Sequence, residues 1–310
     1  MANKAPFVID PARTAIAMAY SNSGMIADSV LPRTPVGTSN FKYLVYNKDE
    51  KFTLPDTRIG RTSRPNEVEF GATELDGSVK DYGLEDPVPQ ADIDNAPANY
   101  DPLNNATEGV SELIMLGREK RVSDVVFNAA TYPAANKQTL SGTSQWSDFA
   151  NSDPVAAILA AIDSMLMRPN VMVLGQAVFT KLRTHPLIVK AINGNSGDSG
   201  IVMRQALADL FEMDEVLVGQ GWINNAKLGQ TASFGRLWGK HCALLRRDMT
   251  ATTRRGITFG VTATFGTRVA MTRPDPDIGL RGGTRVRVGE SVDELITASD
   301  AGYFFENAVA

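Results

Sequence analysis

The sequence NKDEKFTLPDTRIGRTSRPNEVEF, residues 47–70, begins a stretch that continues to residue 101 and has too little apolar material to build a core. Prolines interrupt the stretch, and its few apolar side chains can cover only one face of a hairpin. An isolated two-stranded hairpin is marginal in water, and long loops without structure of their own are usually functional or disordered. We therefore expect a projecting hairpin that packs against another copy of the chain, which indicates an assembly subunit rather than a self-contained enzyme.

The same stretch carries the charged side chains that we expect at a contact between subunits. Asp76-Gly77 fits a tight turn within it. The candidate interface residues are Lys48, Lys51, Arg58, Arg61, Arg64, Glu67 and Glu69.

The overall composition is that of an ordinary globular protein. The chain has 310 residues, of which 43% are hydrophobic and 21% are charged, so wholesale disorder is excluded. At roughly 150 residues per domain, this length predicts about two packed units. The net charge of -4 argues against a nucleic-acid binder that works by bulk charge, because phosphate neutralisation needs a basic excess.

Cysteine usage and hydropathy suggest where the protein works. The single cysteine, Cys242, rules out an intrachain disulfide framework and fits a reducing compartment. The first ten residues lack the apolar core of a signal peptide, and no segment approaches the ~20 apolar residues that span a bilayer. We expect a soluble protein made in a cytoplasm.

Apolar periodicity predicts the elements of an α+β fold. Residues 1–40 are small, polar and proline-spaced, which is typical of an arm that lies across something rather than of a core element. Alternation predicts a strand over residues 41–46, and a helix should run from Pro102 to about Ala130. The apolar stripe of this helix changes face between its two halves, so we expect it to contact different partners along its length.

The second half of the sequence predicts an α/β block followed by strands. A helix begins at Asp153-Pro154, an N-cap followed by proline at the first helical position. A strand, turn and helix over residues 170–179, a glycine-rich break, a helix over about 202–211 and a strand over 215–218 complete the block. From Phe234 onward the pattern is β, with an apparent strand over 237–245 and clear alternation over 257–265.

No residue pattern predicts catalysis or metal binding. His241 and Cys242 are neighbours in the apparent strand, where their side chains point to opposite faces, so they do not form a nucleophile and base pair. His185 is the only other histidine, and two histidines with one cysteine cannot make a standard structural zinc site. The glycine-rich run 194–200 lacks the phosphate-loop and dinucleotide spacings. We expect no catalytic, cofactor-binding or metal site.

Arginines gather late in the chain. We favour pairing with acidic residues of a neighbouring copy, such as Glu67, Glu69, Glu74 and Asp76, over a purely solubilising role or direct contact with nucleic acid. Stacking aromatic residues do not interleave with them. The set comprises Arg246, Arg247, Arg254, Arg255, Arg268, Arg273, Arg281, Arg285 and Arg287.

Several segments, in this order, resemble the major capsid protein family of tailed bacteriophages, which has the HK97-like fold. The resemblance covers nearly the whole chain and rests on the order of the segments rather than on any single motif. The segments are DYGLEDPVP (81–89), GREKRV (117–122), LSGTSQWSD (140–148), SDP (152–154), PNVMVLG (169–175), LRTHP (182–186) and SDAGYFFENAV (299–309).

The resemblance implies a division of the chain. Residues 1–40 would be an N-terminal arm, and 41–90 an extended β-hairpin, the E-loop, that lies over an adjacent subunit. Residues 91–152, with a long spine helix, and the returning strands 266–310 would form a peripheral domain, and 153–265 an axial α/β domain. Some members crosslink subunits through lysine–asparagine bonds, for which Lys48, Lys51 and Asn307 are candidates, although free surface lysines are the default.

The resemblance also implies a function. The chain would be a non-enzymatic head protein that self-assembles into hexamers and pentamers of an icosahedral shell around double-stranded DNA, contacted weakly and without sequence specificity. Portal, scaffold or decoration proteins would be partners, there would be no membrane contact, and assembly would occur in the host bacterial cytoplasm before the protein resides in the virion. No long charged helical segment precedes Phe41, so a fused scaffold looks absent. The alternatives are an encapsulin-like nanocompartment shell and an α+β hydrolase with an unrecognised site.

Overall fold

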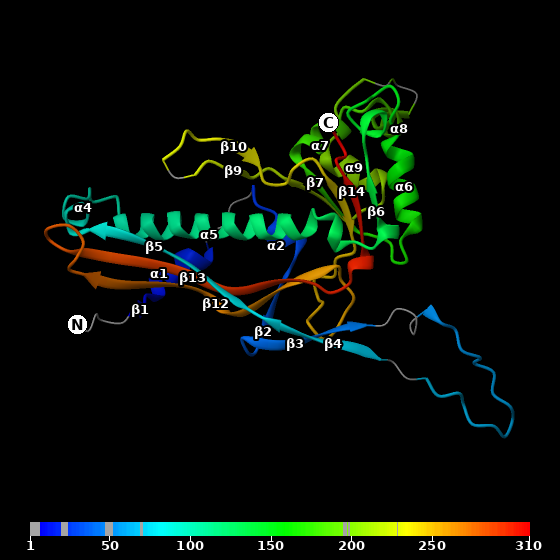
Figure 1. The fold of residues 1–310 in the computed structure, drawn as a ribbon, viewed down its shortest axis with the longest axis horizontal. Helices are drawn as coiled ribbons and strands as arrows, with labels where there is room; N and C mark the ends of the chain where they lie inside the picture. Colours follow the sequence, from blue (N-terminus) through cyan, green and yellow to red (C-terminus); the bar gives the residue numbers. More distant parts are fainter. Residues whose placement is uncertain are drawn as a thin grey trace.

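The computed structural model describes residues 7–19, 24–46, 52–68, 71–194, 197, 199–227 and 229–310. Within these ranges the chain forms a long helix laid on one twisted sheet, a compact α/β block at one end of that helix, and a thin hairpin that projects from the body (Figure 1). The arrangement is α+β.

The first sheet is built around two long antiparallel strands, β12 (Gly260–Asp275) and β13 (Gly283–Ile296). β5 (Lys80–Pro89) pairs with the free side of β13, so the strand after the hairpin returns to the body here. Two short N-terminal strands pair with β12, namely β1 (Val8–Ile9), antiparallel, and β2 (Arg33–Val36), parallel.

The long helix α5 (Pro102–Val126) begins where the sequence predicts, because the Asp101 carboxylate accepts hydrogen bonds from the amides of Leu103 and Asn104 at 2.9 and 3.3 Å. It ends at Val126 rather than near Ala130, because the Asn128 side chain accepts from the Ala130 amide and starts a separate 3-10 turn. A short helix, α4 (Gln90–Asp94), precedes it.

The predicted change of face along α5 is confirmed. Val110 and Ile114 in its first half pack in a small cluster with Ala270 and Val288 of the sheet. Val122 in its second half joins a larger cluster that reaches into the α/β block. The helix therefore bridges two separately packed parts of the molecule.

The second sheet has β7 (Val171–Gly175) at its core, and every residue of this strand is buried. The strand order is β6-β14-β11-β7-β8. The remaining strands of this sheet are β6 (Lys137–Thr139), β8 (Glu215–Gly219), β11 (Cys242–Leu245) and β14 (Gly302–Glu306). The helices of this block are α6 (Pro154–Ser164), α7 (Gln176–Leu182), α8 (Pro186–Asn193) and α9 (Arg204–Leu210).

The expectation that residues 1–40 lie outside any core is wrong for part of this segment. α1 (Pro11–Ala19) and α2 (Ala27–Val30) are helices, and Ala17 and Leu31 are fully buried. The segment reads as an arm because it is short and polar between its apolar residues, yet those residues fill gaps between α5 and the sheet.

The predicted turn at Asp76-Gly77 is also wrong. Both residues lie inside β4 (Ala72–Ser78), which pairs along its length with β3 (Asn40–Tyr46). Gly77 is a glycine because the ring of Phe41 lies across it, and a Cβ atom there would approach the ring to 2.6 Å.

Two strand boundaries differ from the sequence prediction. Residues 237–240 form a turn, so the apparent strand over 237–245 reduces to β11. In the alternating segment 257–265, strand β12 begins only at Gly260. Upstream, β9 (Trp222–Asn224) and β10 (Phe234–Arg236) form a small hairpin that the sequence analysis did not anticipate.

Candidate functional site

The strongest candidate for a functional site is the projecting hairpin. β3 and β4 pair from Asn40 opposite Ser78 to Tyr46 opposite Ala72, and the described residues beyond them, 52–68, are exposed throughout. Large apolar side chains lie on this exposed segment, including Phe52 at 55% and Leu54 at 88% exposure. Figure 1 shows the segment reaching away from both sheets. Leu54 is almost wholly uncovered, whereas Phe52 is partly covered because it lines a pocket at the base of the hairpin.

The hairpin also carries the charged residues predicted to contact another subunit. Arg58, Arg61, Arg64 and Glu67 are all exposed on the projecting segment, and among the described residues none of their side chains forms an ion pair. The backbone is locally ordered, because the Asp56 carboxylate accepts the Arg58 amide at 2.9 Å. Lys48, Lys51 and Glu69 lie outside the described residues.

The base of the hairpin is attached to the body. The Leu44 amide donates to the Thr253 carbonyl at 2.9 Å, and the Lys42 ammonium pairs with Glu74 across the two strands at 2.7 Å. A mainly apolar pocket of about 240 Å³ lies beside the base, between Leu44 and Phe52 on the hairpin and residues that include Leu166 of the α/β block. The hairpin is thus anchored at one end and unsupported at the other.

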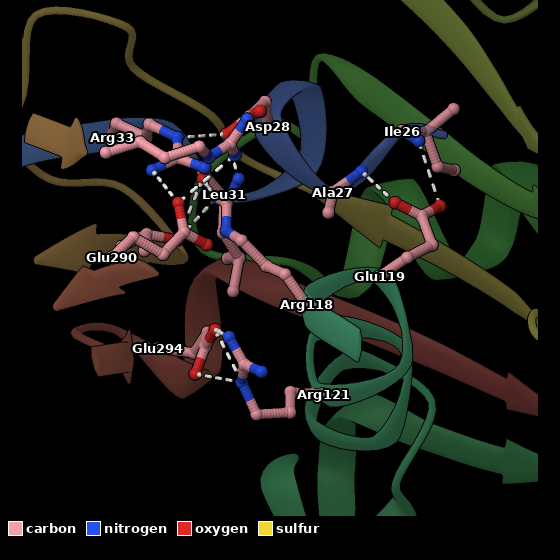
Figure 2. Close-up of polar contacts among 12 residues, drawn as sticks. Ile26, Ala27, Asp28, Leu31, Arg33, Arg118, Glu119, Arg121, Glu290 and Glu294 are labelled. Carbon is pink, nitrogen blue, oxygen red and sulfur yellow. Dashed lines mark hydrogen bonds and ion pairs between the residues drawn. The ribbon is translucent and has the colours of Figure 1, made fainter. Parts of the chain in front are cut away.

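The body that carries the hairpin is held together by a buried carboxylate on α5 (Figure 2). Glu119 is fully buried and accepts the amides of Ile26 at 2.9 Å and Ala27 at 2.8 Å and the indole N–H of Trp238 at 2.5 Å. Burial raises the pKa of Glu119 above its usual value, although these hydrogen bonds oppose the shift. One side chain therefore joins the N-terminal segment, the spine helix and the α/β block.

The adjacent residue, Arg118, anchors the same N-terminal segment to the sheet. It is 2% exposed, pairs with Asp28, and donates to the Leu31 carbonyl at 3.3 Å and to the Thr262 hydroxyl at 3.0 Å. Burial alone would raise the pKa of Asp28, but Arg118 and Arg33 outweigh it and hold that pKa below its usual value. This network was missed by the sequence analysis, whose only available signal was a charged pair on an otherwise apolar helix stripe.

The network extends to the strands of the first sheet. Arg33 and Arg268 both reach the buried carboxylate of Glu290, at 3.0 and 3.1 Å. One turn along α5 from Arg118, Arg121 pairs with Glu294 at 3.0 Å. Removing one member of a buried ion pair leaves the other charge buried and unpaired, which is costly. These contacts therefore favour a single packing of the N-terminal segment, α5 and the first sheet.

Five of the late arginines that we expect to pair with a neighbouring copy already have a partner within the chain. Each of the five reaches a carboxylate of its own chain instead, and Glu74, named as an acceptor, pairs with Lys42. The pairs are Arg247–Glu215, Arg268–Glu290, Arg273–Asp275, Arg285–Asp275 and Arg287–Glu85. The partners of Arg247, Arg268 and Arg287 are distant in the sequence, whereas Asp275 lies only two and ten positions from Arg273 and Arg285.

The histidines and the cysteine do not form a nucleophilic site. Cys242 is fully buried, and burial raises the pKa of its thiol far above the usual range. His241 uses its Nδ1 atom to accept the Asn307 amide at 3.0 Å. His185 is the N-cap of α8 and its Nε2 atom lies 3.1 Å from the Ser152 hydroxyl.

The described part of the chain contains neither a metal-binding group nor a membrane-spanning helix. There, no group of three His, Cys, Asp or Glu side chains is placed to hold a metal ion. No helix in these ranges has the length and apolar character needed to cross a bilayer. The glycine-rich run after α8 is described only in part and forms no assigned strand or α-helix beyond Asn193.

Comparison with known proteins identifies a sequence family. A family model described as phage major capsid protein E matches residues 126–221. The major capsid protein of Pseudomonas phage JBD67 is 56% identical over 308 residues, which covers 99% of each chain. Identity at this level over the full length shows shared family membership.

Comparison with solved structures identifies the fold. A phage-related protein from Bordetella bronchiseptica RB50 superposes with a TM-score of 0.75 at 23% identity, covering 98% of each chain. The capsid of cyanophage P-SCSP1u gives a TM-score of 0.61 at 8% identity, covering 93% of this chain and 89% of that chain.

The encapsulin alternative has weaker support. The SrpI encapsulin of Synechococcus elongatus PCC 7942 matches with a TM-score of 0.53 at 12% identity, covering 97% of this chain and 95% of that one, so it shares the fold alone. The full-length sequence relative is a capsid protein. The chain therefore belongs to the phage major capsid proteins with the HK97-like fold, and it is a structural protein of a phage head shell.

Proposed function

We propose that this chain builds hexamers and pentamers of an icosahedral shell that encloses double-stranded DNA, and that it has no catalytic activity. The observation that carries the proposal is the projecting hairpin, whose apolar side chains are exposed although they lie on an ordered segment. Burying a side chain of this size stabilises a contact by roughly 1.5–3 kcal/mol, and a shell repeats the contact in every subunit.

The hairpin supplies the contact between neighbouring copies. Arg58, Arg61, Arg64 and Glu67, together with Lys48, Lys51 and Glu69, lie against the adjacent subunit in this proposal. Such a contact is heterologous, because the hairpin of one copy meets a different surface on the next, and heterologous contacts close into rings. The buried network around Arg118 and Glu119 keeps the body rigid while the hairpin adjusts to each position in the shell.

In this proposal, each part of the chain has a separate structural role in the shell. Residues 1–40 act as the N-terminal arm, 41–90 as the E-loop, 91–152 and 266–310 as the peripheral domain, and 153–265 as the axial domain. Assembly takes place in the host bacterial cytoplasm, with portal, scaffold or decoration proteins as further partners. The net charge of -4 suits a wall that contacts DNA weakly, because tight phosphate contacts would hinder packing and release.

Electron microscopy of the purified, overexpressed protein tests this proposal. Closed icosahedral particles, or tubes of the same capsomers, with rings of six and five subunits are the expected result. A species of subunit mass at every concentration would contradict it. Particles isolated from phage-producing cells should protect double-stranded DNA from nuclease, whereas particles that hold a protein cargo would favour a nanocompartment.

A further inference from the structure

The small hairpin β9–β10 has two unlike faces. Side chains alternate across a strand, and the register pairs Trp222 with Arg236 and Asn224 with Phe234. These four residues share the outer face and all are exposed, with Trp222 at 51% and Phe234 at 68%. On the inner face, Ile223 packs against the cluster around Trp238.

The outer face is held in a fixed arrangement. The Arg236 guanidinium carbon lies 3.9 Å from the centre of the Trp222 ring, and the same side chain donates to the Gln220 carbonyl at 2.8 Å. Tryptophan and arginine are the residues most often found to dominate binding at protein interfaces. An isolated two-stranded hairpin is only marginally stable. This one nevertheless presents an ordered aromatic and cationic face, which is suited to binding a partner.

The segment that carries this face has formal charge of one sign. Between Glu215 and Asp248 the sequence has no acidic residue, whereas Lys227 and Lys240 lie beside the hairpin and are exposed. Another region of the same chain has the opposite bias. Between Lys80 and Arg118 there is no lysine or arginine, and exposed acidic side chains include Asp92, Asp94, Asp101, Glu108 and Glu112.

The acidic region includes a helix face suited to close approach. Glu108, Gly109, Glu112 and Leu113 are exposed along α5, and Leu113 is 56% exposed. Gly109 has no atom within 4 Å of the position that a Cβ would occupy. Glycine in a helix interior destabilises the helix relative to alanine, and packing within the chain does not explain this one.

We propose that the outer face of β9–β10 in one copy docks on the acidic face of α5 in a second copy. The inference rests on the proposed shell function and adds to it an interface separate from the projecting hairpin. The two surfaces do not overlap, so each copy offers both and the contact is heterologous, as ring formation requires. The cationic side chains then face carboxylates, and Trp222 and Phe234 cover Leu113 and the open position at Gly109.

Zero-length carbodiimide crosslinking of assembled particles tests the contact. Particles are assembled from a mixture of ¹⁴N and ¹⁵N subunits, and mass spectrometry identifies the joined peptides. We expect mixed-label links from Lys227 to Glu108 or Glu112. Particles whose links at these residues are absent, or join only peptides of one label, contradict the docking but leave the shell function intact. If wild-type protein forms no particles, both proposals fall.

Charge reversal provides a second measurement on the same pair of surfaces. Arg236→Glu and Glu108→Arg should each lower the particle yield at least about tenfold, which corresponds to roughly 1.4 kcal/mol, and the double variant should recover most of it. Arg204→Glu, an equal charge change at an exposed position of α9, is the matched control and should assemble normally. Circular dichroism establishes that each subunit is folded.

Three outcomes of this series would overturn the docking. If the double variant is folded but does not regain particle yield, Arg236 and Glu108 do not pair between copies. If adding Arg61→Glu, instead of Arg236→Glu, restores the particle yield of Glu108→Arg, the acidic face of α5 contacts the projecting hairpin. Normal particle yield with less packaged DNA in Arg236→Glu would assign the face to nucleic acid.

The Gly109 position gives a readout that a purely structural role would not produce. Gly109→Met should raise the melting temperature of the unassembled subunit, because methionine favours a helix more than glycine does. The same variant should lower particle yield, because its side chain fills the space that the partner occupies. A more stable subunit that assembles as well as wild type contradicts the proposal.

Discussion

The indole nitrogen of Trp238 donates a 2.5 Å hydrogen bond to Glu119 in a region where both side chains are completely buried. The two residues are 119 positions apart in the sequence, and the same carboxylate accepts the amides of Ile26 and Ala27. Three distant parts of the chain therefore share one buried carboxyl group. The body of the subunit is fixed by this contact, whereas the projecting hairpin has no comparable support.

Replacing Glu119 by glutamine should lower the free energy of unfolding by about 2–4 kcal/mol. Glutamine has nearly the same shape, but its amide nitrogen faces backbone or indole donors and leaves at least one of them unpaired. Urea denaturation of unassembled subunits measures the change. Glu108→Gln, at an exposed carboxylate on the same helix, is the control and should stay within about 0.5 kcal/mol of wild type. A loss that small for Glu119→Gln would contradict the assigned role.

Arg118→Leu should loosen the N-terminal segment. The change frees the buried Leu31 carbonyl and removes one of the two arginines that pair with Asp28, at an expected cost of about 1–3 kcal/mol. Limited trypsin digestion should then cut after Arg33 much faster than in wild type. Lys120→Met, which removes an exposed charge two positions further along α5, should leave cleavage after Arg33 unchanged. Equal protection of the segment in Arg118→Leu would show that the network does not hold it.

Stability should fall as the pH drops below about 6.5. Burial lowers the pKa of His185 in the folded subunit, so the unfolded chain takes up the proton first and the folded state loses stability as the pH passes downward through this window. The free energy of unfolding, measured from pH 7.5 to 5, should therefore depend less steeply on pH in His185→Asn. Burial lowers the pKa of His241 in the same direction, and the double variant should be the flattest. Identical slopes in all three proteins would contradict this origin.

Gly77→Val should disturb the hairpin at its root. The ring of Phe41 occupies the space beside Gly77, so a branched side chain must push it from its place. We expect the free energy of unfolding of the subunit to fall by about 1–2 kcal/mol. We also expect the particle yield to fall. Gly37→Val is the control, because at Gly37 no atom lies within 4 Å of an added Cβ. Unchanged particle yield in Gly77→Val would argue against a role for the hairpin geometry.

Local signals in the sequence were sufficient for the elements with strong patterns. α6 follows from an N-cap, a proline and one apolar face, and β7 follows from an unbroken apolar run before a glycine. The under-packed hairpin was also readable, because composition alone shows that residues 47–70 lack a core.

The errors occurred where partners distant in sequence decide the structure. Asp76-Gly77 has the sequence of a turn, but Phe41 on the opposite strand makes glycine a packing requirement. The burial of Leu31 depends on α5 and β12, which come much later in the chain. Glu119 has no local pattern that distinguishes it from a solvated glutamate, and only the fold brings Trp238 to it.

In the proposed shell, the projecting hairpin of one molecule is incomplete by itself and is packed by another molecule. Deletion of residues 49–66, followed by analytical ultracentrifugation and thermal denaturation beside wild type, tests it most directly. We expect a subunit that melts within a few degrees of wild type and forms no closed particles. A deletion that unfolds the subunit, or one that still assembles closed shells, would contradict it.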